Sequence, residues 1–339
     1  MNLKQNKSKF KIIPIALGIV FSSIAIYLLF KDINTDVFMD SISKTNKAYF
    51  IAALMCNYVT YLIHTKRWSL FFKSENIRFK DFYHCVVIGH LLNTILPSKS
   101  GEIIRPYYLS KLHNLNYVKT LTTCFSERLL DAIIIVIIVI TGSYYFGQAE
   151  LYALMNKGVS VLALAICLII LVITIIIKTS LLTKIVTRLK FKGMKIIQPL
   201  LEKIQEGFRL LEDRKSLLKI VLYTILYWMA GSLTMYFLLK SCPIPEQLQT
   251  FTISIFIGGA MGVSLSLPSA PANIGIYSYT LFTVFTLILN IENIELRAQE
   301  ESALIAATVI IHLGSIIPDF LLGLYSYFKL SGKVFFPTR

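Results

Sequence analysis

Long apolar runs with few charges restrict the folding of this chain more than any other feature of its sequence. A helix needs roughly 20 apolar residues to cross the ~30 Å hydrocarbon core of a bilayer. Charged residues make up only 16% of the chain, and its mean hydropathy is +0.65. The sequence therefore predicts an all-α polytopic membrane protein with about six full transmembrane helices. The predicted crossings lie at about residues 12–30, 48–64, 129–147, 158–177, 220–239 and 302–328.

Lysine and arginine beside these segments predict the orientation of the chain, because cytoplasmic loops carry an excess of positive charge. Four lysines precede the first segment, and residues 178–219 carry eleven Lys or Arg against four acidic residues. The acidic stretch 290–301 is typical of the outer face. We therefore expect a multi-pass protein of the plasma membrane with both termini in the cytoplasm. The first segment lacks a small-residue cleavage site before Lys31, so we interpret it as a retained helix.

If this orientation holds, each of two intervals between the segments must enter and leave the membrane on the same side. Residues 84–119 start and end in the cytoplasm, and residues 251–289 start and end outside. Each interval holds a similar polar break, LPSKSG at 96–101 and LPSAPANIG at 267–275, about half the chain apart. Two broken hairpins that enter from opposite faces are typical of an inverted repeat. Two full crossings within residues 251–289 are the alternative.

The residue types at the two breaks explain why helices stop there. Proline ends a helix, glycine permits a turn, and serine hydroxyls bond freed backbone groups. Backbone that is not helical at membrane depth is tolerated only where it is buried in protein or lines a wet cavity. We therefore predict a polar cleft beneath two re-entrant helical hairpins. The residues assigned to the hairpin breaks are Pro97, Gly101, Pro268, Pro271 and Gly275.

The whole chain, residues 1–339, is predicted to be a single membrane domain. Its first half, 12–147, contains the first hairpin, and its second half, 220–328, contains the second. The basic stretch 178–219 has amphipathic patches, so we interpret it as a cytoplasmic helical connector on the membrane surface. An ordinary solvated connector is the alternative interpretation.

The net charge of +15 raises the question of nucleic acid as a partner. The chain has no zinc-binding or RNA-recognition signature, so we attribute the charge to loops that face anionic lipid headgroups. The five cysteines are unclustered and lie mostly in apolar runs, where cysteine serves as a small apolar residue. No GxxxxGK[ST], HExxH or GxSxG motif occurs. We therefore expect no nucleic acid, no cofactor and no metal.

Two sequences around the first break are similar to those of a known membrane family. They are NTILPSKSGEIIRPYYLSK at 93–111 and LTTCFSERLLDAIIIVI at 121–137. They resemble the membrane-domain family of lysylphosphatidylglycerol synthases, the flippase-like part of the MprF proteins. LPSAPANIGIYSY at 267–279 resembles the Pro-x-x-Pro-Gly-x-Gly-x-x-Glu break of that family. The resemblance covers roughly residues 10–330 and implies two inverted repeats with re-entrant helices around a polar cavity.

The chain departs from the family pattern in its second half. Ala272 and Asn273 stand where family members often have glycine, and Ser278 stands where a glutamate is common. His312 lies near the place of a frequent arginine. The resemblance therefore implies a less charged second half of the cavity. Because the sequence ends at Arg339 without an aminoacyl-transferring domain, we do not expect aminoacylation by it.

The resemblance implies a flippase-like transporter that moves a polar-headed phospholipid, or a lipid-linked molecule, between leaflets. The expected partner is an anionic or aminoacylated phospholipid, or a lipid-linked substrate. The alternative is a membrane-embedded transferase or an accessory protein in envelope lipid or glycolipid synthesis. A second copy of the chain and an enzyme of envelope-lipid synthesis are the protein partners to consider.

Charged residues near the first break are the strongest candidates for contact with a lipid headgroup. Glu102 and Arg105 lie three residues apart and can pair on one helix face. Arginine suits bidentate contact with phosphate, and a structural ion pair is the alternative. Glu127, Arg128 and Asp131 open the third segment at pairing distance from one another. Snorkelling to the interface is the alternative for them.

Two polar residues in the last segment are further candidates. Asp319 follows Pro318 well inside the membrane, and His312 lies two turns earlier. An intramembrane carboxylate is by default a functional hypothesis. A proton-coupled role is one interpretation, and a bond to backbone freed by Pro318 is the other. The predicted headgroup-binding residues, none of them catalytic, are Asn93, Ser98, Lys99, Glu102, Arg105, Glu127, Arg128, Asp131, His312 and Asp319.

Overall fold

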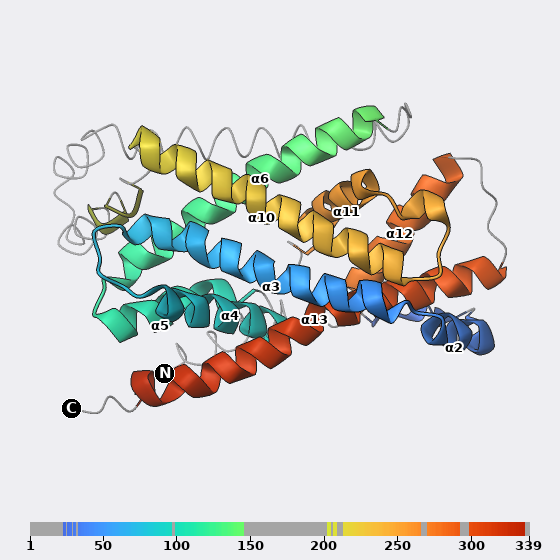
Figure 1. The fold of residues 1–339 in the computed structure, drawn as a ribbon, viewed down its shortest axis with the longest axis horizontal. Coiled ribbons are helices and arrows are strands. Elements are labelled where there is room, and N and C mark those ends of the chain that lie inside the picture. The colour runs from blue at the N-terminus through green and yellow to red at the C-terminus, as the bar shows by residue number, and fades with distance from the viewer. Residues whose placement is uncertain are drawn as a thin grey trace, which may run out of the picture. The chain divides into compact units, whose positions relative to one another are not determined.

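The computed structural model consists of helices and turns throughout its described residues (Figure 1). These residues are 33–96, 99–145, 213–265, 270–291 and 298–335, with isolated positions at 23–31 and 202–208. No strand occurs among them, so the prediction of an all-α fold is confirmed for this part of the chain. The predicted crossing at 158–177 and most of the crossing at 12–30 lie outside the described residues.

Three helical runs of the described chain are long and apolar enough to cross a membrane. One is α10 (Arg214–Ser241) and one lies within α13 (Ala298–Phe335), where crossings were predicted at 220–239 and 302–328. The third, Pro271–Asn290, includes most of α12 (Ile276–Ile291). These helices support a multi-pass membrane protein.

The helices α3 (Lys47–Ser69) and α6 (Tyr117–Tyr145) cover the crossings predicted at 48–64 and, over its described part, 129–147. Helix α3 continues five residues beyond the predicted end. This extension places Arg67 inside a helix, three residues beyond the predicted end of the crossing. The difference arises because the prediction ended the crossing at the first charged residues, and helical backbone tolerates buried, paired charges.

Polar residues with short side chains fix where several helices begin. Their side-chain oxygens accept hydrogen bonds from backbone N–H groups in the first turn, which have no partner inside the helix. The distances from these N–H groups lie between 3.0 and 3.4 Å. The residues are Asn46 before α3, Asn116 before α6, Asp213 before α10 and Thr250 before α11 (Phe251–Ser264).

Each predicted hairpin consists of two helices separated by a break. The first contains α4 (Phe79–Ile95) and α5 (Gly101–His113), and the second contains α11 and α12 with the 3-10 turn η4 (Pro271–Asn273) between them. Helices α4, α5 and α11 have 17, 13 and 14 residues. At 1.5 Å per residue they reach about 20 to 26 Å, short of the ~30 Å core. Helices α11 and α12 lie side by side (Figure 1).

The chain divides into two compact units, each assembled from both halves of the sequence. Helices α3, α4, α5, α10 and α13 contribute residues to both units, α5 only its first residue to unit 1. The remaining described elements are α2 (Thr35–Ser43), η1 (Leu70–Phe72) and η3 (Glu246–Leu248). Unit 1 comprises Met1–Tyr61, Val87–Gly101 and Tyr227–Tyr327, and unit 2 comprises Leu62–Val86, Glu102–Leu226 and Phe328–Arg339.

An aromatic cluster forms part of the core of unit 2. Trp68 is fully buried, and its ring lies edge-on to the rings of Phe72 and Phe82 at centroid distances of 5.8 and 5.5 Å. Such edge-to-face pairs contribute about 0.5–1.5 kcal/mol each beyond their buried area. The cluster holds the end of α3 against the start of α4.

Candidate functional site

A close contact between two helices lies beside the first hairpin break in unit 1. The N–H of Leu96 donates to the carbonyl oxygen of Leu92 at 2.9 Å. This hydrogen bond, between residues four apart as in an α-helix, closes helix α4 before the break. Lys99, an exposed residue, has a left-handed backbone with φ of 50°. Pro97 and Ser98 lie outside the described residues, so their predicted roles stay predictions.

Gly101 is required at this break for space. A Cβ atom on Gly101 would lie 1.9 Å from the carbonyl oxygen of Gly89 and 2.7 Å from Oδ1 of Asn93. Real Cβ atoms do not approach backbone this closely, so only glycine allows the start of α5 to pack on α4 here. Helix α5 begins at Gly101, and Lys99 is the described residue of this stretch with a left-handed backbone.

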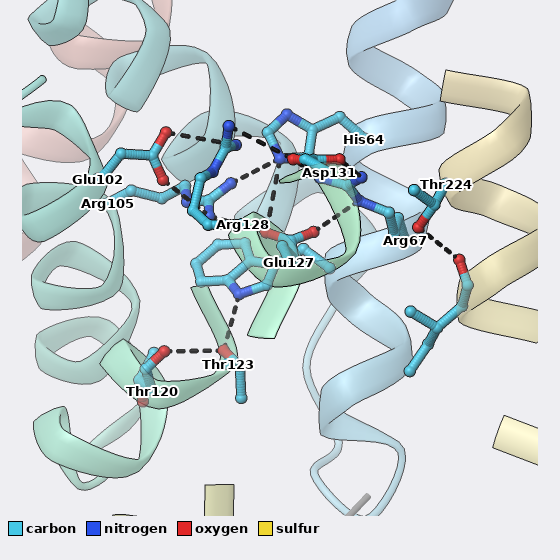
Figure 2. A network of polar contacts seen from close by, with 12 residues as sticks. His64, Arg67, Glu102, Arg105, Thr120, Thr123, Glu127, Arg128, Asp131 and Thr224 are labelled. Carbon is cyan, nitrogen blue, oxygen red and sulfur yellow. Dashed lines mark hydrogen bonds and ion pairs between the residues drawn. The ribbon is translucent and has the colours of Figure 1, made fainter. Parts of the chain in front are cut away.

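A cluster of charged side chains lies within unit 2, and we call it the arginine cluster (Figure 2). It joins the end of α3, the start of α5 and the middle of α6. Five of the predicted headgroup-binding residues meet in it, together with two residues that the sequence analysis did not select. Its members are His64, Arg67, Glu102, Arg105, Glu127, Arg128 and Asp131.

Arg67 is the most extensively paired cation of the cluster. Its Nε donates to Oε1 of Glu127 at 2.9 Å. Its Nη1 and Nη2 donate to the two carboxylate oxygens of Asp131 at 2.6 and 3.3 Å, which is a bidentate pair. Arg67 and Glu127 are fully buried, and Asp131 is 4% exposed. One guanidinium group therefore bridges two carboxylates that have almost no access to solvent.

Arg105 links Glu127 to the aromatic core and to His64. Its Nη2 donates to Oε2 of Glu127 at 2.8 Å, and its Nη1 lies 2.7 Å from Nε2 of His64. A guanidinium group can only donate, so Nε2 of His64 accepts and the imidazole is neutral with its proton on Nδ1. The guanidinium carbon of Arg105 lies 4.6 Å from the ring centre of Trp68, within cation–π range. The Trp68 Nε1–H in turn donates to Oγ1 of Thr123 at 3.0 Å.

Glu102 and Arg128 form the accessible edge of the arginine cluster. Their side chains are 24% and 39% exposed, whereas the other charged members are 6% exposed or less. Glu102 contacts Arg105 at 3.5 Å and Arg128 at 3.4 Å. The three buried pairs have shortest contacts of 2.6 to 2.9 Å. Glu102 is therefore shared between two guanidinium groups at longer distances than those of the interior.

The arginine cluster is electrically balanced. Three guanidinium groups face three carboxylates, and His64 is neutral. Removing one partner of a buried pair leaves an uncompensated charge, which costs about 3–5 kcal/mol. An anion added at the edge would disturb this balance unless it displaced Glu102 from Arg128.

His64 and Arg67 are the cluster members that sequence reasoning missed. Both follow or close the predicted crossing at 48–64, and neither was selected as a site residue. A local signal was present, because His64, Arg67 and Trp68 recur at i, i+3 and i+4 and therefore share one face of α3. Three polar or aromatic residues on one face at the end of an apolar run indicate a buried polar contact rather than a solvated loop.

Asp319 of α13 lies in a second polar group, within unit 1. Its Oδ1 accepts from the hydroxyl of Tyr61 at 2.5 Å, and its Oδ2 lies 2.8 Å from Oγ1 of Thr94. Nδ1 of His90 lies 3.9 Å from Oδ1. The contacts of the carboxylate therefore run to side chains of α3 and α4, and the sequence alone had suggested backbone near Pro318 as one alternative.

The second hairpin break is anchored by His312, also within unit 1. Nε2 of His312 donates to the carbonyl oxygen of Ala272 at 2.8 Å. The imidazole stacks on the ring of Tyr277 at 4.2 Å with an angle of 7°. Ala272 and Asn273 both have a left-handed backbone, with φ of 59° and 54°. His312 thus holds a carbonyl oxygen that the irregular backbone leaves outside a helix.

Replacing Ala272 by glycine is expected to raise the free energy of unfolding by up to about 1 kcal/mol, because glycine adopts the left-handed region without strain. Ala270→Gly is the matched control, since Ala270 has an ordinary φ of −62° and gains nothing from glycine. Thermal unfolding of the purified variants measures both effects. A less stable Ala272→Gly protein would show that the left-handed backbone carries no strain here.

A small ion-pair group ties the described part of the basic connector to unit 2. Nζ of Lys119 lies 2.9 Å from Glu206 and 3.3 Å from Glu75, and Glu206 also pairs with Lys203 at 2.9 Å. Burial lowers the pKa of Lys119, but hydrogen bonds to Glu206 and Glu75 outweigh this and raise it above its ordinary value. Hydrogen bonds from Lys203 and Lys119 lower the pKa of Glu206. The remainder of residues 178–219 lies largely outside the described chain.

The structure thus places the predicted site residues in separate groups. Five meet in the arginine cluster of unit 2. In unit 1, Asn93 faces Gly101 at the first break, Asp319 joins Tyr61 and Thr94, and His312 joins the second break. Among the hairpin residues of that second break, Pro268 lies outside the described chain, Pro271 begins η4, and Gly275 has φ of 86°, which requires glycine.

An all-helical, multi-pass membrane protein with a buried and balanced charge cluster is the class that this fold and site define. The chain belongs to the lysylphosphatidylglycerol synthase TM region family, whose model matches residues 15–323. The family resemblance read from the sequence is therefore confirmed.

Curated relatives of the chain are archaeal membrane proteins. It is 29% identical over 142 residues to UPF0104 membrane protein MJ1595 of Methanocaldococcus jannaschii, covering 41% of this chain and 42% of that protein. It is 27% identical over 221 residues to UPF0104 membrane protein PH1989 of Pyrococcus horikoshii, covering 57% of this chain and 64% of that protein. The matched part of the chain therefore spans less than two thirds of the length of either relative.

Proposed function

We propose that this protein is a flippase-like transporter that moves a polar-headed phospholipid, or a related lipid-linked molecule, between the leaflets of the plasma membrane. The accessible edge of the arginine cluster is the observation that carries the proposal. Arg128 is 39% exposed, is paired at 3.4 Å with Glu102, and rests on a fully buried ion-pair network. Arg128 can therefore bind a lipid phosphate while the buried ion pairs of the cluster stay intact.

Exchange of one anion for another is the mechanism that the geometry favours. A lipid phosphate binds Arg128 in place of Glu102. The contacts of the Glu102 carboxylate, at 3.4 and 3.5 Å, are longer than the shortest contacts of the other two carboxylates. Arginine binds phosphate in a planar, bidentate manner, so the exchange replaces one charge-assisted pair by another. When the lipid moves on, Glu102 returns to Arg128 and restores the balance. Neither state leaves a guanidinium group unpaired.

The buried part of the cluster positions this edge. Glu127 and Asp131 are fixed by Arg67, and Arg128 is itself 3.4 Å from Asp131 on the next turn of α6. A binding group is most effective when packing and neighbouring hydrogen bonds already hold its side chain in place. In this proposal the hairpin breaks provide the non-helical backbone that lines a polar route, and re-entry from opposite faces makes that route an inverted repeat.

Transport of a leaflet-labelled phospholipid tests the proposal. The purified protein is reconstituted into liposomes that carry a headgroup-labelled anionic phospholipid, and loss of label to an impermeant quencher reports movement between leaflets. Arg128→Gln is expected to slow this movement at least about tenfold, because hydrogen bonds to charged groups contribute about 1.5–3 kcal/mol. Glu102→Gln is expected to slow it as well, because the bound phosphate then lacks a competitor.

Lys44→Gln is the matched control for the loss of one cation. Lys44 is 63% exposed and pairs with Asp40 of the short helix α2. It is not one of the candidate site residues. The Lys44→Gln variant is expected to move lipid at the rate of the unchanged protein. If the unchanged protein moves no lipid but changes the lipid composition of cells that express it, the transferase or accessory alternative replaces the transporter.

A further inference from the structure

The short helix α2 lies beside the ends of two long helices of unit 1. The backbone N–H of Asn34, the residue before α2, donates to Oγ of Ser302 near the start of α13 at 3.0 Å. The N–H of Asn46, which follows α2, donates to the carbonyl oxygen of Ser241 at the end of α10 at 2.8 Å. Helices α10 and α13 are long and apolar enough to cross a membrane. A helix held beside the ends of two such crossings lies at a surface of the bilayer.

Helix α2 is too short to cross the membrane itself, and it is fixed at both ends. Its nine residues reach about 14 Å, less than half of the ~30 Å hydrocarbon core. Oδ1 of Asn34 accepts from the N–H groups of Asp36 and Val37 at 3.1 and 3.2 Å, which caps the first turn. With the bonds of Asn34 and Asn46 to neighbouring helices, α2 is held in one place on unit 1.

Two faces of α2 meet protein and water. Val37 and Ser41 lie four residues apart on the face that packs on the rest of unit 1, where Val37 is half-buried and Ser41 is buried. Asp36 and Asp40 also lie four residues apart, and both are exposed. The acidic face is therefore directed away from the protein.

The third face of α2 is apolar and exposed. Met39 is 64% exposed and Ile42 is 39% exposed, and a spacing of three residues places both on one side of the helix. Apolar and charged faces side by side on a helix at a bilayer surface are typical of an interfacial helix. Such a helix lies in the plane of the membrane with its apolar face about 5–10 Å into the boundary between headgroups and acyl chains.

Helix α3, which follows α2 in the chain, continues this apolar surface. Ile51, Met55 and Val59 recur every four residues along α3 within unit 1, and they are 59%, 63% and 47% exposed. Such a stripe on a crossing helix faces acyl chains. Tyr49 is 40% exposed in the first turn of α3, and tyrosine is enriched where the membrane meets water. The boundary of the bilayer therefore lies near the start of α3, next to α2.

A second copy of the chain fits the apolar face of α2 less well than lipid does. Stable protein interfaces bury about 800 Å² on each partner, from roughly 20–30 residues. The apolar face of α2 offers two large side chains, Met39 and Ile42. A symmetric contact through this face would also bring the like charges of Asp36 and Asp40 toward each other.

We infer that α2 is an interfacial helix that inserts Met39 and Ile42 among the acyl chains of the adjacent leaflet and keeps Asp36 and Asp40 in water. Its partner is the lipid surface, and its position fixes the depth of unit 1 in the bilayer. The attraction is apolar, because the helix carries two carboxylates against the single ammonium group of Lys44 directly after it. Anionic lipid is therefore not needed to hold α2 in place.

Tryptophan fluorescence of the full chain in phosphatidylcholine liposomes tests this position. Met39→Trp and Asp40→Trp each add one indole to the two tryptophans of the chain, and subtraction of the unchanged protein isolates its emission. Met39→Trp should be quenched by lipids brominated near the headgroup end of their chains and protected from aqueous acrylamide. Asp40→Trp, the matched control on the charged face, should be quenched by acrylamide and little by brominated lipid.

Three results would overturn the inference. Acrylamide quenching of Met39→Trp as strong as that of Asp40→Trp would mean that the apolar face lies in water. Protection of Met39→Trp from both quenchers would mean that protein, such as a second copy, covers the face. Insertion that requires anionic phospholipid, or that is lost at high salt, would mean that charge rather than apolar contact holds α2. The expected result is the same quenching with and without anionic lipid.

Spin labels keep the test decisive if a tryptophan variant does not fold. Met39→Cys and Asp40→Cys are labelled with a nitroxide, and the labelled unchanged protein supplies the background of the native cysteines. The label at 39 should respond to oxygen, which dissolves among acyl chains, and the label at 40 to a water-soluble nickel chelate. Equal response of both labels to the chelate would contradict the interfacial position. Neither measurement requires lipid movement, so failure of the proposed function leaves this inference standing.

Discussion

Replacing Arg67 by methionine is expected to lower the free energy of unfolding by about 3–5 kcal/mol, the cost of leaving buried charge without its partner. Arg67 is the fully buried cation that joins Glu127 at 2.9 Å and Asp131 at 2.6 Å. Methionine fills much of the same volume, so the loss measures charge rather than a cavity. Thermal or denaturant unfolding in detergent micelles gives the measurement. Lys66→Met is the matched control, because Lys66 is the exposed neighbour on the same helix.

A compensating variant separates the electrostatic explanation from a packing defect. Adding Glu127→Gln and Asp131→Asn to Arg67→Met removes the carboxylates that lack a partner, and part of the lost stability should return. If Arg67→Met is as stable as Lys66→Met, or if the triple variant is the least stable of all, the balanced cluster is not what stabilises unit 2.

Replacing Gly101 by alanine is expected to lower the free energy of unfolding by about 3 kcal/mol or more, or to prevent folding. The added Cβ would lie 1.9 Å from the carbonyl oxygen of Gly89, and a backbone atom cannot give way as the end of a side chain can. Gly231→Ala is the matched control, since a Cβ on Gly231 meets nothing within 4 Å in the middle of α10. That change should be neutral, or should stabilise by up to about 1 kcal/mol through helix propensity.

Yield of monodisperse protein and its melting temperature measure both glycine variants. Equal stability of Gly101→Ala and Gly231→Ala would mean that α5 does not begin against α4 as described. The first hairpin would then lose the contact that fixes its break, and the position of Glu102, one residue later, would need another explanation.

The features that the sequence predicted well are those that depend on neighbours along the chain. Apolar runs of helix length gave the helical class and the positions of α10 and α13. The pairing of Glu102 with Arg105 and of Arg128 with Asp131 followed from spacings of three residues on one helix face. The role of Gly101 in the hairpin break stays a prediction, and the structure adds that the start of α5 leaves no space for a side chain there.

Contacts between distant parts of the chain could not be predicted from one sequence. Arg67 and Glu127 are 60 residues apart, so no local spacing shows that an arginine after one apolar run neutralises acids before another. Asp319 meets Thr94 across 225 residues, and threonine is too common in apolar helices to identify it as a partner. The number of full crossings, and the re-entry of residues 251–289, stay predictions for the same reason.

The lipid that stays bound to the purified protein is the most direct test of the central claim, that a phosphate competes with Glu102 for Arg128. Native mass spectrometry of protein extracted in mild detergent counts anionic phospholipids on the unchanged protein, Glu102→Gln and Arg128→Gln. Glu102→Gln should retain more lipid than the unchanged protein, and Arg128→Gln should retain less. Equal retention by all three proteins would contradict the claim, because the edge of the arginine cluster would then have no part in binding the headgroup.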